Sequence, residues 1–114
     1  MTLLPGEVYW AFFDKPRPVV VVSREELNRG DYVVVLPLTT AQLALRRSLP
    51  SCVAIQGRVY GLKDCVAQAE MITVLFRSDL IDPAEGPIAT LADETMREIV
   101  RAVGFVMQAE CEPS

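Results

Sequence analysis

The stretch PRPVVVVS, residues 16–23, places four consecutive valines behind a proline–arginine–proline entrance. β-Branched residues favour extended backbone, and an unbroken apolar run predicts a strand that is buried on both faces. Arg17 lies between two prolines, which restrict the backbone on either side of it. Two interpretations follow: either Arg17 points into water beside a buried strand, or the stiff entrance holds its guanidinium where an anion binds.

Apolar and β-branched segments flank the valine run on both sides, and they predict further strands. These are residues 6–13 (GEVYWAFF), 32–40 (YVVVLPLTT, ending near Pro37), 52–56 (CVAIQ) and 64–75 (DCVAQAEMITVL). The segments between them predict less regular structure: a turn or short helical excursion at 24–31, a loop at 41–51, a turn at 57–63, and a loop with at most one helical turn at 78–89.

One helix is predicted, over residues 90–110, with Thr90 placed to cap it and acidic Asp93 and Glu94 in its first turn. Its apolar positions recur every three or four residues and form one stripe: Ala92, Met96, Ile99, Val103 and Val106. Short strands followed by one packed helix predict a mainly β domain, a small curled antiparallel sheet or barrel with a C-terminal helix.

The length and composition indicate a single domain spanning residues 1–114. No apolar run approaches the roughly 20 residues that a membrane span needs, and the first ten residues do not resemble a signal peptide. We therefore expect no membrane association and a cytoplasmic location. The hydrophobic content of 51% is high for a soluble chain of this length, which favours burial of apolar surface in an oligomer.

Several kinds of chemistry are disfavoured by residue type. The chain has no histidine, and its cysteines (Cys52, Cys65 and Cys111) have no CxxC spacing, so neither a metal site nor a cofactor is expected. The net charge of −4 is unevenly distributed: residues 1–63 hold 8 Lys/Arg against 5 Asp/Glu, and residues 64–114 hold 3 against 10. A local basic face is therefore compatible with an acidic chain.

The order of several segments resembles the MazF/PemK family of toxins from bacterial toxin–antitoxin pairs. The resemblance spans about residues 6–110 and comprises GEVYWAFFD, RPVVVVS, NR, VVVLPLTT, YGLKDCVAQAEMITVL and the final helix. It implies an SH3-like barrel, a homodimer, sequence-selective cleavage of single-stranded RNA, and a cognate antitoxin peptide as partner.

The resemblance also implies roles for individual residues. Arg17 corresponds to an arginine that contacts the scissile phosphate, Thr39 to a threonine that hydrogen-bonds the same phosphate, and Thr40 is its neighbour. Metal-independent cleavage by the ribose 2′-hydroxyl leaves a cyclic phosphate and a 5′-hydroxyl. Its transition state gathers negative charge, which a fixed guanidinium stabilises more than it stabilises the ground state.

The chain departs from the family pattern at its proposed acid and base. A longer loop with a Glu–Gln–Gly segment usually precedes the Arg–Pro pair, whereas here FDKPRP is continuous. Asp14 is then one candidate base, with an ordinary turn aspartate as the alternative. Glu70 retains an acidic position on its predicted strand, where it would act as base or pair with Arg17 or Arg58.

The remaining RNA-binding candidates are more weakly indicated. Gln68 stands where some family members carry an arginine, Arg46 and Arg47 follow PLTT, and Tyr60 lies in a glycine-flanked turn. The aromatic cluster of residues 9–13 would suit base stacking, but strand alternation makes the core the default position for its members.

Two functions of different class remain open. One is a metal-independent, sequence-selective endoribonuclease. The other is a catalytically weakened binding module that recognises an antitoxin, a protein target such as a topoisomerase, or RNA that it does not cut. A purely structural SH3-like domain is a third reading, and it predicts no anion affinity near Arg17.

Overall fold

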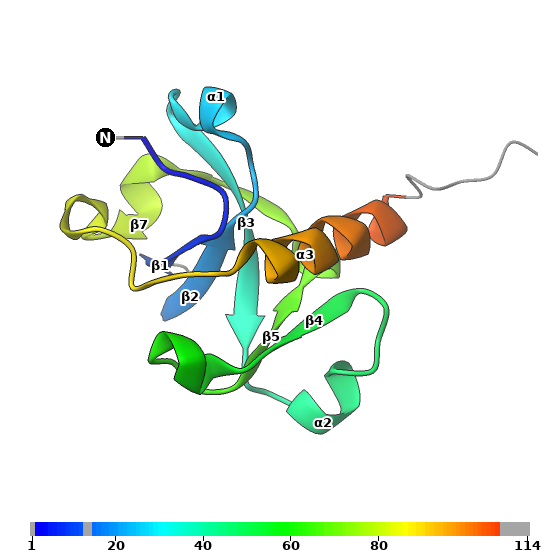
Figure 1. The fold of residues 1–114 in the computed structure, drawn as a ribbon. Coiled ribbons are helices and arrows are strands. Elements are labelled where there is room, and N and C mark those ends of the chain that lie inside the picture. The colour runs from blue at the N-terminus through cyan, green and yellow to red at the C-terminus, as the bar shows by residue number, and fades with distance from the viewer. Residues whose placement is uncertain (1, 13–14, 108–114) are drawn as a thin grey trace, which may run out of the picture.

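A computed structural model of the chain describes residues 2–12 and 15–107 (Figure 1). The strands are β1 (Glu7–Phe12), β2 (Pro16–Val21), β3 (Tyr32–Thr39), β4 (Cys52–Ile55), β5 (Cys65–Gln68), β6 (Thr73–Phe76), β7 (Leu80–Ile81) and β8 (Ala89–Thr90). The helices are α1 (Glu25–Asn28), α2 (Leu43–Arg46) and α3 (Asp93–Val106), with 3₁₀ turns η1 (Gly57–Tyr60), η2 (Ala69–Met71), η3 (Arg77–Asp79) and η4 (Pro83–Glu85). The prediction of a mainly β chain with a C-terminal helix is confirmed.

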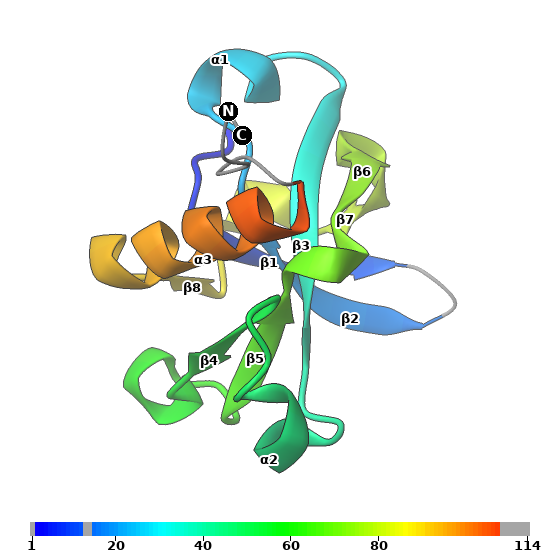
Figure 2. The ribbon, with the colours of Figure 1, turned by 90° about the vertical axis from the view of Figure 1, so that its right-hand side faces the viewer.

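The strands form one curled antiparallel sheet in the order β4-β5-β3-β2-β1-β7, with β6 on β3 and β8 on β1. The three residues of η3 join β6 directly to β7, so the two outer strands of the β6-β3-β2-β1-β7 set are brought together. This closure makes the small SH3-like barrel that the sequence predicted. Figure 2 shows α3 lying across the sheet, with the β4–β5 hairpin below it.

The valine run of β2 is buried on both faces, as predicted. Val19 and Val21 face the barrel interior, which they share with Tyr9, Ala11, Val33, Val35, Leu75 and Leu80. Val20 faces the opposite side and packs in a second cluster with Val8 and Leu36 beneath α3. Because side chains alternate along a strand, one run of valines supplies both clusters.

The helix α3 begins at Asp93, three residues later than predicted. Thr90 belongs to β8 and is paired with Glu7, and the N-cap residue is Ala92, so the proposed Thr90 cap is wrong. The apolar stripe is confirmed for Ile99, which is buried, and for the partly buried residues beside it, Met96, Val103 and Val106. Residues 108–110 of the predicted helix lie outside the described residues.

Three further boundaries differ from the predictions. Residues 64–75 are two strands rather than one, because η2 separates β5 from β6. The predicted loops contain α2, β7 and β8. β3 continues through Pro37, which is the last residue of its pairing with β2, so the missing N–H interrupts no continuous ladder. Within the described ranges, no helix has the length and apolar character needed to span a membrane.

Candidate active site

A cavity of about 430 Å³ opens where β2 begins and β3 ends. Residues from four separate segments line it: Trp10, Lys15, Pro16, Arg17, Pro18, Leu38, Thr39, Thr40, Gly61, Leu62, Lys63 and Cys65. Arg17, Thr39 and Thr40, which were selected from the sequence, therefore meet around one cavity.

Strand register brings Arg17 and Thr39 together. β2 and β3 are antiparallel, and their pairing ends with Val19 opposite Pro37, so Arg17 and Thr39 each lie two residues beyond that last pair, at the same end of the two strands. On its other edge β3 pairs with β5 through Leu38 and Thr39. The cavity lies where the pairing of β2 with β3 has ended.

The Thr39 hydroxyl is oriented by its own turn. Its Oγ1 accepts a hydrogen bond from the backbone N–H of Ala41, at 3.1 Å. This bond uses the oxygen as acceptor, so the hydroxyl hydrogen can be donated to another group. Thr39 can therefore act as a donor toward an anion in the cavity.

The electrostatic character of the cavity is cationic. Lys15, Arg17 and Lys63 line it, and the other described lining residues include no Asp or Glu. Burial, followed by the nearby Asp64 carboxylate, raises the pKa of the Cys65 thiol to about 11, so this thiol is neutral at physiological pH. Phosphate is the anion that a guanidinium and two ammonium groups suit best.

One wall of the cavity is the loop that links η1 to β5. Gly57 is packed so closely against it that a Cβ at this position would lie 1.9 Å from the Lys63 carbonyl oxygen. The Leu62 N–H donates to the Gly57 carbonyl at 2.7 Å, and the Asp64 carboxylate accepts from the Gly57 N–H at 2.8 Å. These contacts hold Leu62 and Lys63 at the cavity rim.

Tyr60 lies in the same loop but does not line the cavity. Its hydroxyl accepts a hydrogen bond from the Ala92 N–H at 3.1 Å, immediately before α3. The sequence placed Tyr60 among the RNA-binding candidates; in the fold it ties the loop to the start of the helix.

Glu70 and Gln68 are not among the cavity-lining residues. The chain leaves the strand at η2, so Glu70 is exposed on a turn, and its predicted position on a strand is wrong. Its carboxylate accepts a hydrogen bond from Gln68 Nε2 at 3.1 Å and lies 3.8 Å from the Cys52 sulfur. Burial, together with this carboxylate, raises the pKa of the Cys52 thiol.

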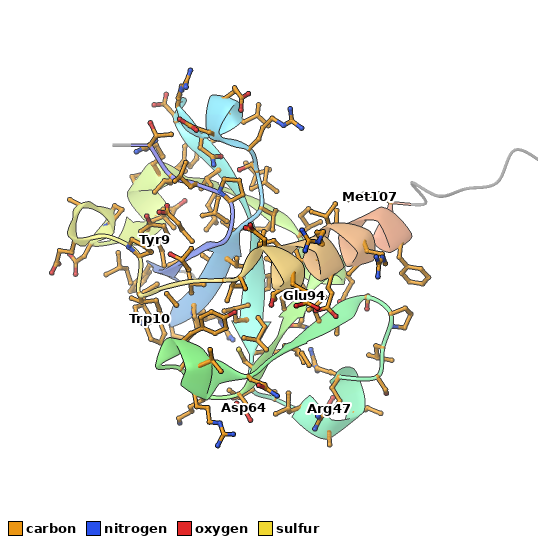
Figure 3. All side chains as sticks on the ribbon, viewed as in Figure 1. Tyr9, Trp10, Arg47, Asp64, Glu94 and Met107 are labelled. Carbon is orange, nitrogen blue, oxygen red and sulfur yellow. The ribbon has the colours of Figure 1, made fainter. Side chains whose placement is uncertain are left out.

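The two arginines that follow PLTT also lie elsewhere. Arg46 is on α2, and Arg47 lines a second cavity of about 290 Å³ together with Cys52, Glu98 and Arg101. Figure 3 shows Arg47 at α2, well apart from Trp10. Asp14 lies outside the described residues, so its position relative to the cavity is not described.

Trp10 is the cavity residue that the sequence reasoning assigned to the core by default. Tyr9 and Ala11 on either side of it are buried, whereas the Trp10 side chain is 41% exposed. Phe12, two residues further along the same face, is also exposed, so the core assignment is wrong for both. The strict alternation of β1 was the available signal. Lys63 was missed as well, because a lysine after a glycine turn is ordinary in sequence.

Across residues 2–12 and 15–107, no cluster of three or more His, Cys, Asp or Glu side chains is arranged to hold an ion. The described residues that line the cavity supply cations, hydroxyl groups and apolar walls.

Comparison with known proteins identifies the family. The family model described as PemK-like, MazF-like toxin of type II toxin–antitoxin systems matches residues 4–107. The chain belongs to this family. The match includes every described residue that lines the cavity.

Solved structures show the same fold. A mycobacterial endoribonuclease in complex with its cognate antitoxin is 26% identical, with a TM-score of 0.78, covering 93% of this chain and 95% of that one. The Mycobacterium tuberculosis toxin MazF-mt6 is 25% identical, with a TM-score of 0.75 and coverage of 90% and 96%. A MazE–MazF structure from Deinococcus radiodurans, 18% identical with a TM-score of 0.74 and coverage of 94% and 96%, supports the fold alone. Among curated proteins, none matches the chain with significant similarity.

Proposed function

We propose that this protein is a toxin-type endoribonuclease that cleaves single-stranded RNA at selected sequences, without a metal ion. The observation that carries the proposal is the meeting of Arg17 and Thr39 in one cationic cavity with Lys15 and Lys63. The family membership and the endoribonuclease relatives support the same activity.

In the proposed reaction the ribose 2′-oxygen attacks the adjacent phosphorus. The new O–P bond closes a cyclic phosphate while the bond to the 5′-oxygen breaks, and that oxygen takes up a proton to leave a 5′-hydroxyl. Arg17 donates to the phosphate oxygens as negative charge grows on them, and Thr39 donates its hydroxyl hydrogen to the same group. Thr40, which also lines the cavity, completes the contacts to this phosphate.

A base must remove the 2′-hydroxyl proton. We assign this role to Asp14, which immediately precedes the cavity residue Lys15, ahead of Glu70, whose carboxylate is bonded by Gln68 outside the cavity. Arg46, the last residue of α2, and Arg47, which follows it, are assigned to phosphates further along a longer RNA. Tyr60 and Gln68 are not assigned to RNA, since each already has a bond within the fold.

Two protein partners belong to the proposal. A second copy of the chain forms a homodimer, and a cognate antitoxin inserts an extended segment into the RNA groove and competes with RNA. The relative solved with its cognate antitoxin supports this pairing. The proposed setting is the cytoplasm, where messenger RNA is available.

Cleavage of a long single-stranded RNA, with chelator present, tests the proposal. The wild type should cut at a few short motifs and leave 5′-hydroxyl ends. Arg17→Ala should lower kcat/KM by about 10²–10³-fold, the usual effect of removing one donor to transition-state charge. Arg29→Ala is the matched control, because this exposed arginine pairs only on the surface with Glu25, at 3.4 Å on α1.

One observation favours a second function, that of a binding module without nuclease activity. β1 ends at Phe12 and β2 begins at Pro16, so the connection between them is too short for the Glu–Gln–Gly segment of the family pattern. Folded wild-type protein that cuts no RNA, but binds an antitoxin peptide or RNA through Arg17, would establish this function instead. Cleavage that Arg17→Ala leaves unchanged would contradict the proposed mechanism.

A further inference from the structure

We propose that Trp10 is the base-stacking residue of the cavity, and that one unpaired nucleobase of the bound strand lies on its indole beside the phosphate held by Arg17. This inference rests on the proposed RNA-binding function and adds a residue to it. It starts from an exposed aromatic side chain in a strand whose neighbouring side chains, Tyr9 and Ala11, are buried.

The position of Trp10 relative to Arg17 follows from strand pairing. Trp10 lies opposite Pro18 in β2, and Arg17 is the next residue, opposite Ala11. Directly paired residues of antiparallel strands have Cα atoms about 4.5–5.5 Å apart. Arg17 and Trp10 are therefore one position apart across the strand pair. Alternation points their side chains to opposite faces of the sheet, and the two residues meet only at the cavity at the end of the strands, which both of them line.

The backbone of Trp10 is held on both sides of β1. Its backbone pairs with Pro18 on one side and with Ile81 of β7 on the other. A rigid proline next to the tryptophan limits backbone motion at the site. Among the described residues, the one aromatic ring pair is Tyr32 with Phe76, so the indole is not stacked on another described ring.

The cavity offers the two kinds of surface that a nucleotide needs. Leu38, Leu62 and Pro18 give it apolar walls together with Trp10, whereas Lys15, Arg17 and Lys63 supply positive charge. A nucleotide likewise carries a flat, largely apolar base and an anionic phosphate joined by one sugar. Stacking on an aromatic ring tolerates any base, because every base has a π-face.

Trp10 is the only tryptophan in the chain, so its fluorescence reports on this one position. The first probe is a short single-stranded DNA of mixed sequence, which lacks the 2′-hydroxyl needed for the proposed cleavage. The second probe has the same sugar–phosphate backbone but abasic sites in place of the bases. We expect the base-bearing strand to quench the indole emission and the abasic strand to leave it nearly unchanged.

Affinity for the labelled strand, measured by fluorescence anisotropy, gives an independent readout. Stacking of one base contributes enough for Trp10→Ala to weaken binding by about 5- to 150-fold. Trp10→Phe, which retains a flat ring, should recover part of the loss. Phe12→Ala is the matched control: Phe12 is exposed on the same face of the same strand but is absent from the cavity lining, so affinity should be unchanged.

The outcomes separate this inference from the proposed function. If the strand binds in a manner that depends on Arg17, yet the indole emission and the Trp10→Ala affinity are unchanged, the stacking role is overturned while RNA binding stands. If neither DNA nor RNA binds, and only an acidic, apolar peptide quenches the indole, both proposals fail and the cavity is a peptide site.

Discussion

Asn28 is completely buried, and its side chain joins three segments of the chain. Its Nδ2 donates to the carbonyl oxygens of Leu3, at 2.9 Å, and Ser23, at 2.7 Å, while its Oδ1 accepts from the Ser23 hydroxyl. The Ser23 hydroxyl oxygen in turn accepts a hydrogen bond from the Val34 N–H at 2.9 Å. Asn28, the first residue of the NR pair in the sequence pattern, thus holds Leu3 and Ser23 together by hydrogen bonds.

Replacing Asn28 by leucine should lower the free energy of unfolding by roughly 2–4 kcal/mol. The substitution leaves two buried carbonyl oxygens without the donor that they have here, and the Ser23 hydroxyl hydrogen without its acceptor, and each such group costs about 1–3 kcal/mol. Urea denaturation followed by circular dichroism measures the change. The neighbouring Leu27→Ala is a control, since Leu27 is exposed and should shift stability by less than about 0.5 kcal/mol. Equal effects at the two positions would contradict the structural role of Asn28.

Cys65 predicts a loss of stability at alkaline pH. Its thiol has a pKa of about 11 in the folded chain against an ordinary value of 9.0, so the folded state retains the proton more strongly than the unfolded state does. The contribution of the protonated Cys65 thiol to the free energy of unfolding is complete below pH 9 and is lost as the pH rises toward 11. This contribution falls by about 2 kcal/mol between pH 8 and pH 10.5.

Urea denaturation at pH 8 and at pH 10.5 tests this prediction. The free energy of unfolding should differ between pH 8 and pH 10.5 by about 2 kcal/mol less in Cys65→Ala than in the wild type. Cys52→Ala serves for comparison, because burial raises the Cys52 pKa in the same direction and this thiol contributes its own part of the loss. An unchanged pH dependence in Cys65→Ala would show that the Cys65 thiol is not shielded as described.

At the scale of elements, the loop between η1 and β5 determines whether the cavity has a second wall. The loop closes only because Gly57 leaves no Cβ in the space occupied by the Lys63 carbonyl. We expect Gly57→Ala to displace Leu62 and Lys63, to lower stability by about 1–3 kcal/mol, and to weaken binding of single-stranded nucleic acid. Thermal unfolding and fluorescence anisotropy measure the two effects.

Gly30→Ala is the control for this substitution. A Cβ added at Gly30 would lie 3.6 Å from the Leu27 carbonyl oxygen, which is an ordinary contact, so the substitution should be tolerated. A Gly57→Ala variant with wild-type stability and affinity would mean that the loop relaxes without cost and does not hold the cavity wall.

At the scale of the whole molecule, the high apolar content of the chain is only partly accounted for by the core. The valine-rich strands and the stripe of α3 are largely used inside one chain. The exposed apolar side chains include Tyr32, Met71, Val74 and Phe76, on or next to β6. Met71 belongs to η2, which packs against α3, so this surface continues toward the helix. An apolar surface of this kind is typical of a protein interface.

We place the proposed homodimer contact on this β6 surface. Sedimentation velocity should show a dimer for the wild type, and Val74→Glu should shift it to monomer by burying an unpaired charge in the interface. Leu27→Glu adds the same charge on exposed α1 and should remain dimeric. A wild type that is monomeric at all concentrations would contradict the dimer; a dimeric Val74→Glu would place its contact on another surface.

The sequence by itself determined the fold class and supplied part of the candidate site. The apolar runs predicted the strands and the three- and four-residue spacing predicted the helix stripe, whereas the family resemblance carried by RPVVVVS and PLTT implied Arg17 and Thr39. The strand and helix signals are local, since backbone preference and side-chain periodicity act over a few residues. The same locality explains the wrong helix start: Thr90 has a good capping side chain but is held by Glu7, a residue distant in sequence.

Only the tertiary structure decided which residues share the cavity. Glu70 and Tyr60 have residue types suited to RNA chemistry, yet the turn at η2 and the bond to Ala92 place them elsewhere. Trp10 and Lys63 have ordinary sequence contexts, yet the barrel brings them to Arg17. The physical reason is that the cavity lies where the pairing of β3 with β2 ends while β3 still pairs with β5 on its other edge, and long-range pairing determines that position.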